Sequence, residues 1–221
     1  LSLSLSNTGE GRPIQVIKSK CLWQYTSDKK IPTTIIGCPL TFPPDKIYGR
    51  MLSGMGAPDI LGTEGTFSFY TSESLSDDKD IGGKVFKVNK SPIMSMELIG
   101  PRISILGGKT DNLKIPFIVT LQQENKNSVF IQFQNNKFEL KKDAWSDWKD
   151  VTFKYGLFKR IRGIFKFYLV EIQPEFKLYA SPINFDPRSP LFPISYPSSY
   201  SKELADNIGL YYTQGMPIDT W

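Results

Sequence analysis

Five residues of one glycine- and proline-rich loop could take part in chemistry. The loop follows the apolar run 31–40, and its candidate substrate-pocket residues are Ser53, Gly54, Met55, Gly56 and Asp59. The main-chain N–H groups of residues 54–56 could face a phosphate, and Asp59 could orient a substrate group. The alternative is structural. In that case the glycines satisfy turn geometry, and Asp59 caps a short helix or turn that begins near Ile60.

No catalytic residue is predicted in this chain. Ser53 stands between a leucine and a glycine, which is not the flanking pattern of a nucleophile elbow, and the chain contains no histidine that could activate it. The lack of histidine also excludes serine–histidine triads, cysteine–histidine dyads and histidine-bearing metal sites within the chain. We therefore assign no metal ligand and no cofactor to these residues.

The elements expected to position the loop are a helix and a strand that precede it. Residues 18–28 are compatible with a short helix, and the β-branched run 31–38 predicts a strand covered on both faces. Ligands usually bind at loops that follow the carboxyl ends of such strands. The two cysteines, Cys21 and Cys38, match no metal spacing. We expect free thiols, with a disulfide as the alternative.

A different pattern begins near residue 84. Short alternating or β-branched runs follow one another, separated by turn signals, and they predict about seven antiparallel strands. In the run 128–133, for example, Val129, Ile131 and Phe133 share one face and would point inward.

Aromatic residues in this β-rich part suggest a second kind of site. Trp145, Trp148 and Tyr168 could form a platform that stacks a ligand ring. The structural alternative is that the two tryptophans pack at the edge of a β core. With the platform, the chain would be a free-standing β-sandwich module that binds a carbohydrate or a protein partner.

The net charge of the 221-residue chain is mild but unevenly distributed. It is +5 overall, whereas residues 84–177 hold 17 basic and 9 acidic residues, a balance of +8. A solvated basic face explains this, with a polyanion site as the alternative, and we predict no nucleic-acid partner. No run of about 18 apolar residues occurs, so we predict no membrane span. The alternating Leu–Ser pattern of residues 1–6 is not that of a signal peptide, and the compartment cannot be predicted from the sequence.

Several short motifs, taken in order, resemble a bacterial and archaeal branch of the alkaline phosphatase superfamily. This branch contains type I phosphodiesterase or nucleotide pyrophosphatase-like predicted phosphohydrolases. The matching segments are 39–44, 49–59, 62–67, 145–148, 178–183, 186–187 and 212–220.

The resemblance implies hydrolysis of phosphate mono- or diesters by a Thr or Ser nucleophile at a two-metal site, usually zinc. The nucleophile and most metal ligands of the family would lie outside this sequence. We therefore expect the chain to be a central segment that is inactive alone, with the phosphate-ester substrate and two zinc ions bound by the complete protein.

The predicted fold class is accordingly α+β or α/β. Residues 1–74 would form a fragment of an alkaline-phosphatase-like α/β core that carries the Gly/Pro-rich loop. Residues 75–181 would form a large inserted antiparallel, sandwich-like β domain. Residues 182–221 would be a Pro-rich return segment with a short helix back to the core.

Overall fold

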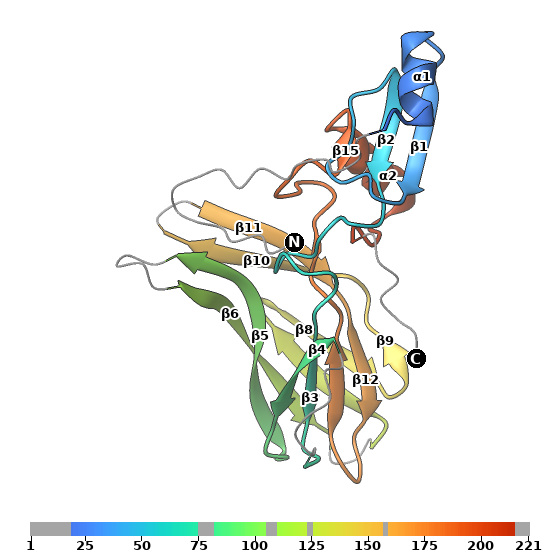
Figure 1. The fold of residues 1–221 in the computed structure, drawn as a ribbon. Coiled ribbons are helices and arrows are strands. Elements are labelled where there is room, and N and C mark those ends of the chain that lie inside the picture. The colour runs from blue at the N-terminus through green and yellow to red at the C-terminus, as the bar shows by residue number, and fades with distance from the viewer. Residues whose placement is uncertain (1–18, 75–81, 105–109, 123–125, 157–158, 215–221) are drawn as a thin grey trace.

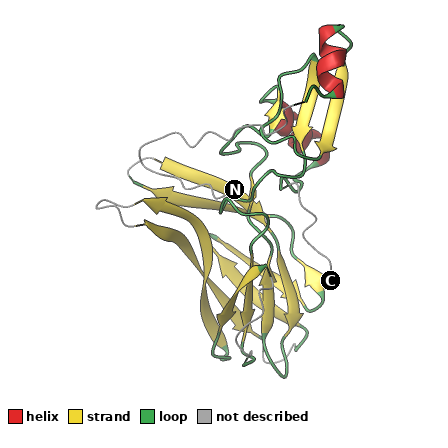
Figure 2. Ribbon diagram, in the orientation of Figure 1, coloured by secondary structure: helices red, strands yellow, loops and turns green. Residues whose placement is uncertain are grey.

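A computed structural model describes residues 19–74, 82–104, 110–122, 126–156 and 159–214 (Figure 1). These residues are mostly β-strand, in several sheets, with two helices, as Figure 2 shows. The β-rich character expected from the alternating runs is confirmed. The part of the predicted C-terminal segment beyond residue 214 lies outside the described residues.

A small layer at one end of the molecule contains both helices. Helix α1 (Leu22–Asp28) leads into β1 (Thr33–Cys38), which pairs in parallel with β2 (Gly49–Ser53). The short strand β15 (Ser195–Tyr196) is antiparallel to β2, and α2 (Tyr200–Ile208) follows it. In Figure 1 this layer stands apart from the larger β body.

The prediction that the 31–38 strand is covered on both faces is wrong. One face packs with α1, where Ile35 joins the cluster of Trp23, Ile47 and Met51. On the other face, Ile36 is 61% exposed. Strand β1 lies at the edge of the sheet and packs with α1, whereas the second helix, α2, contacts the neighbouring strands β2 and β15. The β-branched composition of this run therefore does not reflect two-sided burial.

The large β body contains three sheets. The first has the order β12 (Phe167–Glu171), β13 (Lys177–Ala180), β3 (Phe67–Thr71), β4 (Gly83–Lys87). The second is antiparallel, in the order β5 (Ile93–Ser104), β6 (Thr110–Leu121), β7 (Ser128–Phe133), β8 (Asn136–Lys141). The third has the order β10 (Lys149–Tyr155), β11 (Lys159–Phe165), β14 (Asn184–Phe185). The two-residue strand β9 (Ala144–Trp145) lies beside β12.

The first two sheets enclose one aromatic-rich core. Tyr70 of β3 meets Phe117 of β6 edge-on at 5.2 Å, and Phe117 contacts Phe167 of β12 at the same distance. The predicted inward face of 128–133 is confirmed, since Val129, Ile131 and Phe133 are all buried. Burial of such large apolar side chains supplies most of the stability of a β body.

Two features of the β body do not follow from the local sequence pattern. The run 163–172 has the pattern of one strand, but β11 ends at Phe165 and β12 begins at Phe167 in a different sheet. Strand β3, assigned by sequence to residues 1–74, pairs with β13 and in parallel with β4. The large body therefore draws strands from both sides of residue 75.

Candidate functional site

The loops that follow β1 and β2 are locked together by Thr41. Its hydroxyl donates to the Cys38 carbonyl at 2.6 Å and accepts the Gly54 N–H at 2.9 Å. The Ser53 hydroxyl donates to the Thr41 carbonyl at 2.7 Å. The Ser53 hydroxyl and the Gly54 N–H are thus both used inside the protein, and both residues are buried.

Gly54 is required by this close approach. A Cβ atom at this position would lie 2.3 Å from the backbone of Gly37, a distance that real Cβ atoms do not tolerate. The glycine therefore allows the end of β2 to pass directly against the end of β1. Of the five predicted pocket residues, Gly54 has a structural role here.

Met55 and Gly56 form the exposed part of the predicted pocket. Residues 54–57 make a β-turn closed by a 3.1 Å hydrogen bond from Ala57 N to the Gly54 carbonyl. Gly56 has φ 100°, as the third position of a type II turn requires. Within the described residues, the N–H groups of Met55 and Gly56 have no protein acceptor. The turn therefore presents two backbone donors at the carboxyl end of a parallel strand pair.

Asp59 is a fully buried turn cap. One carboxylate oxygen accepts the N–H groups of Leu61 and Thr63 at 2.8 and 2.9 Å. The other accepts the Thr63 hydroxyl at 2.5 Å and the Thr66 N–H at 2.9 Å. Burial raises the pKa of this carboxyl above its ordinary value despite these four donors. Because both oxygens are occupied, this arrangement is the turn-capping alternative, and it leaves no free carboxylate for a substrate.

The structure brings three of the sequence motifs together around Asn184. This buried amide accepts the N–H groups of Thr213 and Gln214, each at 2.9 Å, with one side-chain oxygen. The Thr213 hydroxyl donates to the Phe185 carbonyl at 3.1 Å. Gln214 in turn lies over Gly65, where a Cβ would be 2.5 Å from its Nε2. Segments 62–67, 178–187 and 212–214 are therefore adjacent.

Gln214 carries an unusual feature for a buried side chain. It is 5% exposed, and neither its side-chain oxygen nor its nitrogen has a hydrogen-bond partner in the described part of the chain. Such groups are rare and call for an explanation. Neither Gln214 nor Asn184 is among the site residues predicted from the sequence. The position of Asn184 between Ile183 and Phe185 was the available signal, since a polar residue in an apolar run indicates a buried partner.

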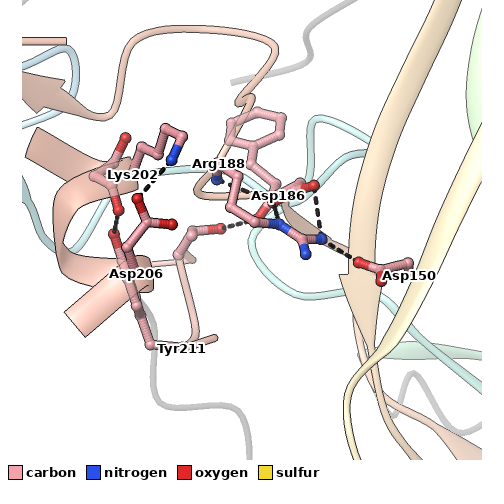
Figure 3. Close-up of polar contacts among 9 residues, drawn as sticks. Asp150, Asp186, Arg188, Lys202, Asp206 and Tyr211 are labelled. Carbon is pink, nitrogen blue, oxygen red and sulfur yellow. Dashed lines mark hydrogen bonds and ion pairs between the residues drawn. The ribbon is translucent and has the colours of Figure 1, made fainter. Parts of the chain in front are cut away.

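An arginine ties the return segment to the β body. The Arg188 guanidinium donates to both oxygens of Asp186, at 2.8 and 3.0 Å, and also pairs with Asp150 of β10 (Figure 3). The two carboxylates raise the pKa of Arg188 further above its ordinary value. The Asp186 side chain is only 4% exposed. This bidentate pair therefore holds a buried carboxylate in place.

The predicted aromatic platform is only partly assembled. Trp145 is 41% exposed, and its ring lies 5.0 Å from Tyr168. Trp148 has different neighbours: the ring of Tyr212 at 4.7 Å and the Lys166 ammonium at 4.8 Å. Trp145 and Tyr168 are thus direct ring partners, and Trp148 packs against the C-terminal segment.

The described residues do not fit a two-zinc site. They contain no group of three or more His, Cys, Asp or Glu side chains that could hold a metal ion. Cys21 and Cys38 are free cysteines. Neither helix in this part of the chain is long and apolar enough to cross a membrane.

Comparisons with known proteins add no relative. A scan against protein-family models, a search of curated proteins and a search of solved structures each find no match for this chain.

Proposed function

We propose that the chain is the pocket-shaping part of a phosphohydrolase of the alkaline phosphatase superfamily, acting on phosphate mono- or diesters. In this proposal the small layer of α1, β1 and β2 is a fragment of the family's α/β core, and the β body is its insert. The type II turn at Met55 and Gly56 carries the proposal, because it offers two backbone donors where parallel strands end.

Backbone N–H groups at such a turn suit the non-bridging oxygens of a phosphate ester. Gly56 has no side chain, and a Cβ placed on it would meet no atom within 4 Å, so the turn is open to a ligand. These donors would bind and orient the ester. The nucleophile and the ligands of the two zinc ions of the superfamily are expected in polypeptide outside this sequence.

The proposal is also supported by the convergence of three parts of the chain around Asn184: motif 62–67, the stretch between motifs 178–183 and 186–187, and the described part of motif 212–220. Asp59 and Asn184 each fix a different loop by accepting several backbone donors. These hydrogen bonds order the loop 59–66 and residues 213–214, and ordered loops suit the positioning of a substrate.

The experiment is a hydrolysis assay on the complete protein, including the polypeptide expected outside this sequence, purified with zinc. The substrates are bis(p-nitrophenyl) phosphate, p-nitrophenyl phosphate and, as a control for unspecific ester cleavage, p-nitrophenyl acetate. We expect release of p-nitrophenol from at least one of the two phosphate esters and loss of this activity with a chelator. Absence of phosphate-ester hydrolysis with zinc and with other divalent metals would overturn the proposal.

The pair of the exposed Trp145 and the half-buried Tyr168 favours the second candidate, a β-sandwich module that binds an uncharged carbohydrate. Aromatic faces at this spacing can stack on a sugar ring. Retention on immobilised neutral saccharides that is lost in Trp145→Ala and kept in Trp148→Phe would support it. Equal retention of both variants would exclude it.

A further inference from the structure

A groove lies where the second and third sheets meet, on the outer surface of the β body. Its volume is about 680 Å³, within the range of ligand pockets. In Figure 1 the hairpin of β10 and β11 lies beside β5 and β6, and β10 contacts β6. The groove follows this boundary and is separate from the Met55 turn.

One wall of the groove is positively charged. Lys154 of β10 and Arg160 of β11 are register partners in the antiparallel pair, so their side chains share one face. Both are exposed, and neither has an ion-pair partner among the described residues. Arg162, two positions along β11, also faces outward, opposite Thr152.

The carboxylates of Glu97 on β5 and Asp150 on β10 are already engaged in ion pairs. Glu97 of β5 is paired with Lys114 at 2.9 Å. Asp150, on the same face of β10, is bound by Arg188. No acidic residue is found among the described residues that line the groove. The cationic wall is therefore available to an anion.

The opposite wall carries groups that both donate and accept hydrogen bonds. Ser95, Ile118 and Gln132 are register neighbours across β5, β6 and β7. Gln134 and Asn135 extend this wall at the β7–β8 turn. An amide side chain offers a donor and an acceptor together, which matches the hydroxyl groups of a sugar. Ile115, Pro116 and Ile118 supply apolar contact for a sugar face.

Gln134 occupies its place at a backbone cost. Its φ is 49°, in the left-handed region where hairpin turns favour Asn and Gly. Its side chain lines the groove.

From these features we propose that the groove binds an anionic saccharide. Its sulfate or carboxylate groups would contact Lys154 and Arg160, and its hydroxyls would contact the amide side chains of Gln132, Gln134 and Asn135. Single-stranded nucleic acid fits less well, because its bases stack on exposed aromatic rings. Among the described lining residues the one aromatic side chain, Phe117, is 2% exposed. This proposal does not depend on phosphohydrolase activity.

Isothermal titration calorimetry on the intact protein tests the proposal with five probes. They are a sulfated dextran oligosaccharide, an oligogalacturonate, an uncharged dextran oligosaccharide of equal length, inorganic sulfate and oligothymidylate. We expect binding of the sulfated probe, the carboxylated probe or both, and this comparison identifies the anionic group. We also expect binding to weaken as salt is added.

Two variants and a matched control assign the binding to the groove. Lys154→Gln with Arg160→Gln is expected to weaken binding of the charged saccharide by about tenfold or more, because two charge-assisted contacts are lost. Lys141→Gln with Lys142→Gln removes the same charge from exposed positions at the far end of β8 and should leave affinity near that of the wild type. Gln132→Ala with Gln134→Ala should weaken binding of the charged saccharide but leave binding of inorganic sulfate unchanged.

Each contrary result would overturn the proposal. These are no binding of either charged saccharide, equal binding of the uncharged one, or tighter binding of oligothymidylate. Inorganic sulfate that binds as tightly as the saccharides would indicate an adventitious ion only. Equal losses in the groove and β8 variants would indicate unspecific attraction to net charge.

Discussion

Asn184 accepts a hydrogen bond from the backbone N–H of Gln214 at 2.9 Å, although the two residues are 30 positions apart. The same side-chain oxygen accepts the neighbouring N–H of Thr213. One buried amide thereby helps to fix the C-terminal segment over the loop that contains Gly65, together with the Thr213 hydroxyl and the contact of Tyr212 with Trp148.

Asn184→Ala is expected to destabilise the protein by about 3 kcal/mol, because two buried N–H groups lose their acceptor. Urea unfolding followed by circular dichroism gives the free energy of unfolding. The control is Asn207→Ala, whose amide makes one exposed hydrogen bond to Glu203, and which should cost well under about 1 kcal/mol. Equal losses in the two variants would contradict the role of Asn184.

Gly65→Ala and Gly56→Ala form a matched pair. Both glycines have positive φ, at 113° and 100°, so both substitutions strain the backbone. Only at Gly65 would the new Cβ also collide, with Gln214 Nε2 at 2.5 Å. We expect Gly56→Ala to cost about 1 kcal/mol and Gly65→Ala about 2 kcal/mol or more in urea unfolding.

The double variant Gly65→Ala with Gln214→Ala separates collision from backbone strain. Removing the Gln214 amide frees the space that the Cβ needs, so the Gly65→Ala cost should fall toward that of Gly56→Ala when measured in the Gln214→Ala background. Strictly additive effects would show that the two positions do not contact each other.

Arg188→Gln is expected to cost about 2–3 kcal/mol, since it leaves the buried Asp186 carboxylate without its bidentate partner. Lys202→Gln serves as the control, because its pair with Asp206 is an exposed contact within α2 (Figure 3). That change should cost less than about 0.5 kcal/mol. Thermal unfolding at matched salt would measure both, and a larger loss for Lys202→Gln would be inconsistent with the burial of Asp186.

Asp59 should titrate above the ordinary aspartate pKa of 3.8, because burial outweighs its four hydrogen bonds. A raised folded-state pKa means that the native protein binds the proton more tightly than the unfolded chain. The contribution of Asp59 to stability is therefore greatest at low pH and is lost as pH rises from about 3.8 through the folded-state pKa. A carboxyl-carbon NMR titration measures this pKa directly, and a value at or below 3.8 would contradict it.

The sequence predicted the elements whose side-chain pattern is local. Val129, Ile131 and Phe133 alternate within six residues, and their burial follows directly from that alternation. The β-branched run that forms β1 wrongly predicts two-sided burial, because its composition does not reveal how many layers cover it. The break at Lys166 was also missed, since inward Phe165 and Phe167 keep one alternation across a change of sheet.

The position of the candidate loop could be predicted from the sequence, but the tertiary contacts of its residues could not. Glycine and proline spacing located the turn at Met55 and Gly56. The use of Ser53 and Gly54 by Thr41 depends on how two loops approach each other, and the pairing of Asn184 with Gln214 depends on a distant segment. Such contacts are set by tertiary packing, which residue spacing does not encode.

The most direct test of the proposed function removes one backbone donor from the turn. Met55 is the second residue of a type II turn, a position that proline favours, so Met55→Pro deletes its N–H group with little effect on folding. Met55→Ala is the control, because it shortens the side chain and keeps the donor. In bis(p-nitrophenyl) phosphate hydrolysis by the intact protein, we predict that Met55→Pro lowers kcat/KM by about tenfold or more while Met55→Ala stays near the wild type. Equal kcat/KM values for wild type, Met55→Pro and Met55→Ala would contradict the account.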